Sequence, residues 1–338
     1  MIDQSKITAT TAAAALTAHS ALSTMDALMR RDVARGLSQS PRQLPSWLLY
    51  DDLGSALFEA ICELPWYRVT RAERGLLRRH ARAIVAAAGQ PTRLVELGAG
   101  SGDKLATLIE EGWAAVPPLA VELVDVSERA LQASRQRLSV FDEIDLVTWP
   151  LAYERALPEL AHSPDASRRT MMLFLGSNVG NFDPPDAERL LRQAWAALAP
   201  GDTLLLGADL VKDEQVLHDA YDDPLGVTAA FNRNLLVRLN RELAADFDVR
   251  AFSHRAAWDP VAARIEMHLV SERQQRVRIP AADLDLMFAR GESIRTEWSH
   301  KYEAAAVYAL LTACGFSPCD QWVDDEARFA LTLARKPV

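Results

Sequence analysis

The segment RLVELGAGSGDKLATLIEE at residues 93–111 decides the fold, because it joins a short apolar run, a glycine turn and a helical pattern without a gap. Arg93 to Leu97 has the length and apolar character of a buried strand, and Lys104 to Glu111 has apolar residues at helical spacing. The turn between them contains Gly98, Gly100 and Gly102. Glycines let the chain turn sharply and let a ligand approach the backbone where a Cβ would obstruct it. The segment therefore predicts a strand, turn and helix unit with a ligand site at the turn.

The sequence on both sides of this segment repeats the alternation of strand and helix. Upstream, residues 72–88 have helical periodicity, and Gly89 and Pro91 end the pattern. Downstream, Leu119 to Val126 predicts a second strand, with Ser127 as the cap of the next helix. Further strands are expected at 170–176, 202–210 and 327–334, with helices at 185–198 and 302–314. This alternation predicts an α/β fold with a doubly wound, Rossmann-like parallel sheet.

The alternation stops between about Lys212 and Tyr302. A long helical pattern at 227–243 is followed by an extended run at 249–253 and an alternating run at 263–279, which indicate antiparallel strands. We therefore expect an α+β substrate domain at 212–300 inserted into a ligand-binding domain at 72–211 and 301–338. Residues 1–71 are expected to contribute to the substrate domain, and Thr8 to Ala21 to be a frayed helix or a disordered lead-in.

Composition excludes several functions. The chain of 338 residues has a net charge of −9, which argues against nucleic acid as a partner because phosphate binding needs a clustered basic surface. No segment has the length of apolar sequence that a membrane span needs, and no group of residues has the spacing of a metal site. Three cysteines are too few for a disulfide framework, which favours a cytoplasmic protein. The oligomeric state cannot be read from the sequence.

Two acidic residues flank the glycine turn and indicate the ligand. Glu96 precedes the first glycine, and Asp125 lies at the end of the following strand, where it can accept hydrogen bonds from both hydroxyls of a ribose. The spacing is G-x-G-x-G, not the G-x-G-x-x-G of dinucleotide sites, and no phosphate-binding lysine motif is present. These features predict an adenosyl ligand, with S-adenosylmethionine as the leading candidate and S-adenosylhomocysteine as its product.

Eight strings, in one order along the chain, extend the pattern beyond the ligand turn. They are LYDDLGSALFEAI (49–61), LPWYRVTRAE (64–73), VELGAGSGDK (95–104), FLGSNVGNF (174–182), DLVKD (209–213), AYDDPLGVTAAFNRN (220–234), RIEMHL (264–269) and GESIRTEWSHKY (291–302). In these strings the chain resembles the L-histidine Nα-methyltransferases of ergothioneine biosynthesis. The resemblance covers roughly Arg30 to the C-terminus and implies three successive methylations of the free histidine amine to give hercynine.

The resemblance also implies roles for individual residues. Donor binding is implied for Gly98, Lys104 and Asp125, beside the neighbouring Glu96 and Gly100 of the turn. The catalytic positions it implies are Tyr67 and Asn181, with Asn181 meeting the substrate amine and Tyr221 the carboxylate. The other positions that line the substrate site are Tyr50, Met267, Glu297 and Ser299.

Physical chemistry is consistent with these roles. An amine must lose its proton before it attacks, and a neutral amide such as Asn181 or a phenol such as Tyr67 can accept from the nitrogen and orient it. Glu297 and Ser299 are two apart in an extended segment, so both side chains are expected on one face. A carboxylate and a hydroxyl there suit a ring with N–H groups and would exclude apolar side chains.

Two positions depart from the family, and two rival functions stay open. Ala152 and Tyr153 stand where the family usually has Asp-Phe for the adenine, so the ring can still be stacked, but Ala152 cannot accept from its amine. We expect weaker adenine binding or a substitute acceptor. Trp66 stands where an acid is common, with no consequence that we can name. The alternatives are a methyltransferase for another amino acid, such as tryptophan, and a non-catalytic adenosyl-binding protein.

Overall fold

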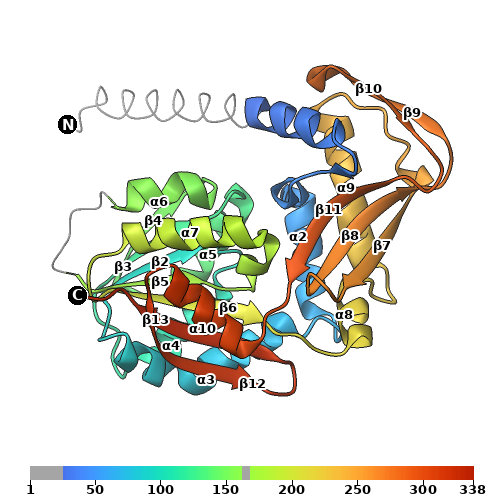
Figure 1. Cartoon of the computed structure of the whole chain (residues 1–338). Coiled ribbons are helices and arrows are strands. Elements are labelled where there is room, and N and C mark those ends of the chain that lie inside the picture. Colours follow the sequence, from blue (N-terminus) through green and yellow to red (C-terminus); the bar gives the residue numbers. More distant parts are fainter. Residues whose placement is uncertain (1–25, 162–167) are drawn as a thin grey trace, which may run out of the picture.

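A computed structural model describes residues 26–161 and 168–338 as two α/β units side by side (Figure 1). One unit contains a large central sheet, and the other contains a smaller, strongly curved sheet. The stretch Thr8 to Ala21, for which a helix or disorder is predicted, lies outside the described residues. Within the described ranges no helix is both long and apolar enough to cross a membrane.

The central sheet has seven strands in the order β12-β13-β6-β5-β2-β3-β4. Its strands, in chain order, are β2 (Arg93–Leu97), β3 (Leu119–Val124), β4 (Ile144–Trp149), β5 (Thr170–Phe174), β6 (Thr203–Asp209), β12 (Ser317–Asp324) and β13 (Phe329–Arg335). The five strands from β6 to β4 are parallel, and β13 and β12 add to the β6 edge in antiparallel pairs. The predicted fold class, a doubly wound α/β sheet, is confirmed.

Helices cover both faces of this sheet. They are α3 (Val69–Ala87), α4 (Asp103–Gly112), α5 (Glu128–Leu138), α6 (Tyr153–Ala161), α7 (Pro184–Ala197) and α10 (Ala304–Ala313). Because side chains alternate along a strand, Leu94 of β2 packs into the core under α3 and α4, whereas Val95 and Leu97 pack into the core under α6 and α7. The two apolar cores hold the carboxyl ends of β2, β3 and β5 at one edge of the sheet.

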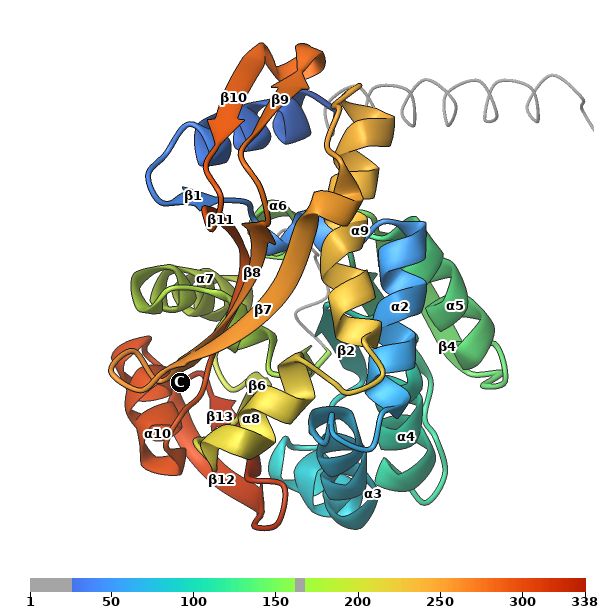
Figure 2. The same cartoon turned by 90° about the vertical axis from the view of Figure 1, so that its right-hand side faces the viewer.

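The second unit is built around a four-stranded sheet in the order β1-β11-β8-β7 (Figure 2). Its strands are β1 (Arg42–Gln43), β7 (Phe252–Asp259), β8 (Arg264–Ser271) and β11 (Ser293–His300), and a separate hairpin contains β9 (Gln275–Ile279) and β10 (Leu284–Phe288). Its helices are α2 (Asp52–Glu63), α8 (Glu214–Tyr221) and α9 (Val227–Glu242). Short 3-10 turns are η1 (Ser46–Leu49), η2 (Asn178–Asn181), η3 (Val249–Ala251) and η4 (Pro280–Ala282).

N-terminal residues join the second unit through backbone pairing and helix packing. Strand β1 pairs in parallel with β11, and α2 packs against α9. The chain enters the central sheet only after α3 and leaves it after β6, then returns at α10. The second unit is therefore made of segments from both sides of the parallel strands in the sequence.

Four expected elements differ from the structure. The extended run expected at 249–253 is the 3-10 turn η3 as far as Ala251, and β7 begins at Phe252. The alternating run at 263–279 is two strands, because the chain turns after Ser271 and β9 pairs with β10 and not with the main sheet. The last helix begins at Ala304 and not at Tyr302, since Tyr302 is held in an extended bridge to Leu210. The second βα strand ends at Val124, which leaves Asp125 outside the ladder.

Candidate active site

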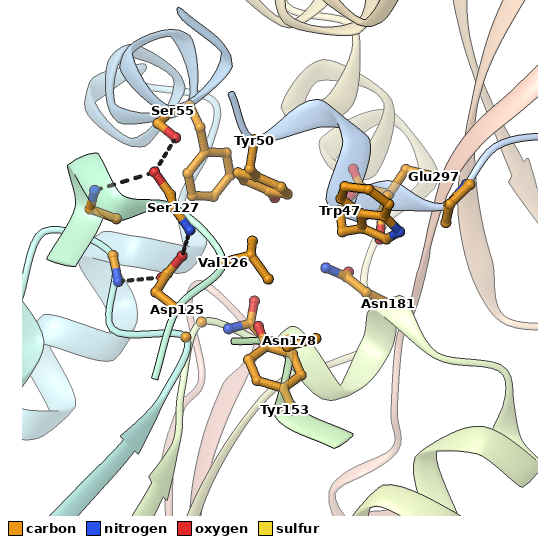
Figure 3. A pocket seen from close by; sticks show the side chains of 18 of the residues that line it. Trp47, Tyr50, Ser55, Asp125, Val126, Ser127, Tyr153, Asn178, Asn181 and Glu297 are labelled. Atoms are coloured by element: carbon orange, nitrogen blue, oxygen red, sulfur yellow. Dashed lines mark hydrogen bonds between the residues drawn. The ribbon is translucent and has the colours of Figure 1, made fainter. Parts of the chain in front are cut away.

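A cavity of about 1430 Å³ separates the two units (Figure 3). The carboxyl edge of the central sheet lines one side with Asp125, Ser127 and Tyr153, and the Ser127 hydroxyl is turned toward Ser55. The second unit and the loop after β5 line the other side, where Asn181 and Glu297 face the same space. A smaller cavity of about 30 Å³ shares lining residues with the large one, among them Tyr50, Tyr67, Asn181 and Glu297, and extends toward β8.

The glycine turn has the backbone geometry that the sequence predicts. Gly98, Gly100 and Gly102 have φ values of 78°, 55° and 79°, which side-chain-bearing residues adopt at a cost. A Cβ on Gly98 would lie 2.6 Å from Asn178 Nδ2 and 2.9 Å from Tyr153 Oη, whereas a Cβ on Gly100 would meet nothing within 4 Å. A side chain at Gly98 would clash with the residues packed under the turn. At Gly100 there is space for a side chain, but the positive φ favours glycine.

Asp125 is held in place by the backbone around it. Its Oδ2 accepts from Gly100 N at 3.0 Å, and its Oδ1 accepts from Ser127 N at 2.9 Å. Burial raises the pKa of this carboxyl, and the two backbone N–H groups oppose the shift. Each carboxylate oxygen has a second lone pair, so Asp125 still has acceptor capacity directed at the cavity.

Tyr153 and Ala152 lie at the start of α6 on the cavity wall. The Tyr153 ring packs edge-to-face on Phe174, with ring centroids 5.4 Å apart. Burial raises the pKa of the Tyr153 phenol, so the ring is neutral. Ala152 lines the cavity, and its carbonyl accepts from the N–H groups of Arg155 and Ala156 in α6. Its methyl group offers no acceptor, as the sequence predicts.

A buried ion pair lies beneath the glycine turn. Glu73 of α3 is fully buried, accepts from Gly176 N at 2.8 Å and 2.9 Å, and pairs with Lys104 Nζ at 3.1 Å. Burial alone would lower the pKa of Lys104, but Glu73 and Glu96 together raise it. The pair thereby anchors the loop after β5 that leads to Asn181.

Glu96 is not among the residues that line either cavity. It lies on β2 with 0 % exposure, and neither of its carboxyl oxygens has a hydrogen-bond partner. Burial raises the pKa of Glu96 to about 8, and the Lys104 ammonium opposes the shift. The side chain thus lies in the buried layer that supports the turn, and its predicted contact with the donor stays a prediction.

The loop after β5 carries Asn181 to the second unit. The Trp298 indole donates to the Asn181 carbonyl at 2.9 Å, and a Cβ on Gly180 would lie 2.6 Å from the His300 carbonyl. The loop is therefore packed directly on β11. This contact brings Asn181 beside Glu297, although Glu297 comes 116 residues later in the sequence. Lys301 follows four residues after Glu297.

Aromatic side chains form the wall opposite Asn181. The Tyr50 ring lies 5.5 Å from the Phe58 ring and 5.6 Å from the Phe231 ring, and the Tyr67 ring lies 6.2 Å from that of Tyr221. Burial raises the pKa of both Tyr50 and Tyr67 well above the ordinary value, so these phenols are neutral donors or acceptors. The packed rings leave little freedom to the hydroxyls that face the cavity.

Glu297 lies at the inner end of the cavity, on β11. A β-bulge interrupts the register between Arg295 and Glu297, and Glu297 is then paired with Met267 of β8. Burial raises the pKa of the Glu297 carboxyl to about 7, opposed by the Lys301 ammonium. Both Glu297 and Ser299 line the small cavity, as their spacing predicts.

A hydrogen-bonded cluster lies behind Ser299. Tyr221 Oη donates to Ser299 Oγ at 2.9 Å, and Lys301 Nζ donates to both of these oxygens at 2.8 Å. Lys301 Nζ also pairs with Asp209 Oδ2 at 3.0 Å. Asp209 ends β6, so the cluster connects the second unit to the carboxyl edge of the central sheet.

The structure brings most of the predicted site residues together. The large cavity is lined by Tyr50, Tyr67, Gly98, Gly100, Lys104, Asp125, Ala152, Tyr153, Asn181 and Glu297, and the small one adds Tyr221, Met267 and Ser299. Sequence reasoning did not single out Glu73, Asn178, Asp209 or Lys301. A signal existed for two of them, since Glu73 is a charge on an apolar helix face and Asp209 is the acidic last residue of a buried strand.

Comparisons with known proteins identify the family of the chain. The profile of the family "Histidine-specific methyltransferase, SAM-dependent" matches residues 29–336. "Histidine N-alpha-methyltransferase" of Mycobacterium tuberculosis is 42% identical over 91% of this chain and 95% of its own, and the same enzyme of Mycolicibacterium smegmatis is 41% identical over 90% and 94%. "Ergothioneine biosynthesis protein 1" of Neurospora crassa is 26% identical over 77% of this chain and 31% of its own. The chain belongs to the family of histidine-specific, S-adenosylmethionine-dependent methyltransferases.

Proposed function

We propose that this protein transfers methyl groups from S-adenosylmethionine to the α-amino group of L-histidine, three times in succession, to give hercynine. The observation that carries the proposal is the shared cavity, with the glycine turn and Asp125 on one side and Asn181 and Glu297 on the other. A donor held at the turn and an amino acid held at Glu297 would meet inside it.

The residues of the turn suit the donor. A Cβ on Gly100 would protrude into open space beside Asp125, so its absence leaves room for a ligand against the backbone. We assign Asp125 to the ribose hydroxyls, Tyr153 to one face of the adenine, and Lys104 with Gly98 to the methionine end. When bound, S-adenosylmethionine supplies a methyl group on a sulfonium, an electrophile that requires no acid catalyst.

On the acceptor side the protein's main task is to orient the amine. An ammonium has no lone pair, so the amine attacks only after it has released its proton to water. We assign Asn181 and the Tyr67 phenol to the amine, and Tyr221 to the carboxylate. Their neutral state leaves them able to accept from the nitrogen and aim its lone pair without holding it as an ammonium.

Glu297 and Ser299 are assigned to the imidazole, with Met267 and Tyr50 as the apolar wall of its pocket. The carboxylate is buried, so an amino acid with an apolar side chain would leave it without a partner. This cost favours histidine over amino acids of similar size that lack a ring N–H group.

The proposal includes a cytoplasmic site of action. The three cysteines are unpaired, which is consistent with a reducing compartment.

A direct assay tests the proposal. The purified protein is incubated with S-adenosylmethionine and either L-histidine, L-tryptophan or no amino acid, and the products are followed by mass spectrometry. We expect additions of one, two and three methyl groups to histidine and none to tryptophan. The proposal fails if S-adenosylhomocysteine binds but no amino acid is methylated, or if tryptophan is the better substrate.

A further inference from the structure

Lys301 places a fully buried ammonium group behind the substrate pocket. An ammonium group has three N–H donors and no acceptor. All three find partners, namely Tyr221 Oη and Ser299 Oγ at 2.8 Å each and Asp209 Oδ2 at 3.0 Å. Lys301 is not among the lining residues of either cavity, so its effect on a ligand must pass through Tyr221 and Ser299.

Neutralising Asp209 does not require Lys301. The Lys212 ammonium pairs with the other oxygen of Asp209, Oδ1, at 2.6 Å and also donates to the Ala327 carbonyl. Among the described residues, Lys212 donates to Asp209 and Ala327 and has no hydrogen bond to Tyr221 or Ser299. Two lysines thus share one carboxylate, and contact with the two pocket hydroxyls distinguishes Lys301 from Lys212.

The cluster determines the direction of the hydroxyl protons. Ser299 Oγ accepts from Lys301 and from Tyr221 at 2.9 Å, which uses both of its lone pairs. Its own proton must therefore point to the small cavity that Ser299 lines. The Glu297 carboxylate, two residues earlier on β11, is an acceptor. The pocket consequently presents one donor and one acceptor, which match the N: and N–H of a neutral imidazole ring.

Lys301 also fixes the direction of the Tyr221 hydroxyl proton. Because the Tyr221 oxygen already accepts from Lys301, its own proton is directed to Ser299 Oγ, 2.9 Å away. The backbone of Tyr221 is held separately, since His254 Nε2 lies 2.8 Å from the Tyr221 carbonyl. Loss of Lys301 should therefore release the hydroxyl and leave the backbone of the pocket wall in place.

We propose that Lys301 is a positioning residue that, together with Tyr221, makes the Ser299 hydroxyl a hydrogen-bond donor toward histidine, and so selects the neutral imidazole ring. This inference rests on the proposed function, because it concerns the same amino-acid site. It assigns the polarity of the pocket to a residue that does not touch the ligand.

The test compares Lys301→Met with Lys212→Met, which each remove one of the two lysines on Asp209. Calorimetry gives the Kd of S-adenosylhomocysteine and, in its presence, the Kd of L-histidine, and steady-state kinetics give kcat and KM. For Lys301→Met we expect the Kd and KM of histidine to rise about tenfold to hundredfold, with a smaller change in kcat and a donor Kd within about twofold of wild type. For Lys212→Met we expect histidine affinity within about threefold of wild type.

A double-mutant cycle with Ser299→Ala separates positioning from general damage. If Lys301 acts through Ser299, the combined variant should bind histidine much more tightly than the product of the two single losses predicts. Should Lys301→Met fail to bind S-adenosylhomocysteine, the Lys301→Gln protein takes its place, with an expected loss of histidine affinity of at least about fivefold.

Three outcomes overturn the inference. Equal effects of the two lysine variants would make Lys301 a structural partner of Asp209 only. Strictly multiplicative losses in the cycle would show that Lys301 does not act through Ser299. A wild-type protein that binds S-adenosylhomocysteine but not histidine would refute the proposed function itself, and this inference with it, whereas the first two outcomes leave the proposed function standing.

Discussion

The pH dependence of histidine binding should follow the ionisation of Glu297. Burial raises the pKa of this carboxyl to about 7. Only the carboxylate is a pure acceptor, so the ring N–H finds its strongest partner when Glu297 is ionised. With that pKa the ionised fraction is about 90% at pH 8 and about 10% at pH 6, so affinity for histidine should fall about ninefold from this group alone.

The change that isolates this effect is Glu297→Gln, which keeps an acceptor oxygen but cannot titrate. Histidine itself titrates in the same range, and the donor site contains its own acid, Asp125. Both contributions occur in both proteins and cancel in the ratio of their affinities. At pH 8 the wild type should bind histidine about tenfold more tightly than the variant, because a hydrogen bond to a charged acceptor is stronger by about 1.5 kcal/mol. At pH 6 the two should be nearly equal.

Isothermal titration of L-histidine into protein saturated with S-adenosylhomocysteine, at half-unit steps from pH 6 to pH 8.5, measures this ratio. The Kd of S-adenosylhomocysteine, measured in the same series, serves as the control and should be the same in both proteins. If wild type and variant lose affinity in parallel as the pH falls, Glu297 either does not titrate in this range or does not contact the ring, and its assignment to the imidazole is refuted.

Substitutions at three further positions test the donor half. Ala152→Asp should tighten the binding of S-adenosylhomocysteine by about 1–3 kcal/mol, since it restores an acceptor at the cavity wall, and unchanged affinity in calorimetry would count against this reading. Glu73→Ala should lower the free energy of unfolding by about 3–5 kcal/mol, because it leaves Lys104 buried without its ion-pair partner and Gly176 N without its acceptor. Glu73→Gln should lower the free energy of unfolding by less when both variants are measured by urea titration, and equal losses would argue that the charge is irrelevant. Glu96→Gln should remove one pH dependence of the free energy of unfolding. Burial raises the pKa of Glu96 from 4.5 to about 8, so between these two pH values the folded protein holds a proton that the unfolded chain has released. The free energy of unfolding of the wild type should therefore fall by about 5 kcal/mol as the pH rises from 4.5 to about 8. This prediction would be contradicted if the free energies of unfolding of wild type and Glu96→Gln changed equally with pH.

The predictions for the donor half came largely from local patterns. Residues 93–104 form a strand, a turn with positive φ angles and a helix, and each step follows from residue type within a few positions. Asp125 was predicted at the end of the next strand for the same reason, because parallel neighbours bring their carboxyl ends to one edge. Local periodicity also predicted α9 and the alternation of β8.

The substrate half depended on the resemblance, since its residues come from distant segments. Tyr50, Asn181 and Glu297 line one cavity because β1 pairs with β11 and the loop after β5 packs on the same strand. No periodicity in the sequence specifies those pairings. The separate β9-β10 hairpin was missed for a related reason, because alternation is the same whichever strand is the partner.

The sequence alone determined the class of the central sheet, the glycine turn and the acidic residue beside it, because these depend on contacts within one βαβ unit. Only the tertiary structure decided how charge is arranged around the pocket. Lys301 is buried against Asp209 from another strand, 92 positions away in the chain, and Glu73 is buried against Lys104 from another helix. Burial and ion pairing are properties of the folded environment, so the ionisation of Glu297 and the direction of the Ser299 proton follow only when the separate segments are packed together.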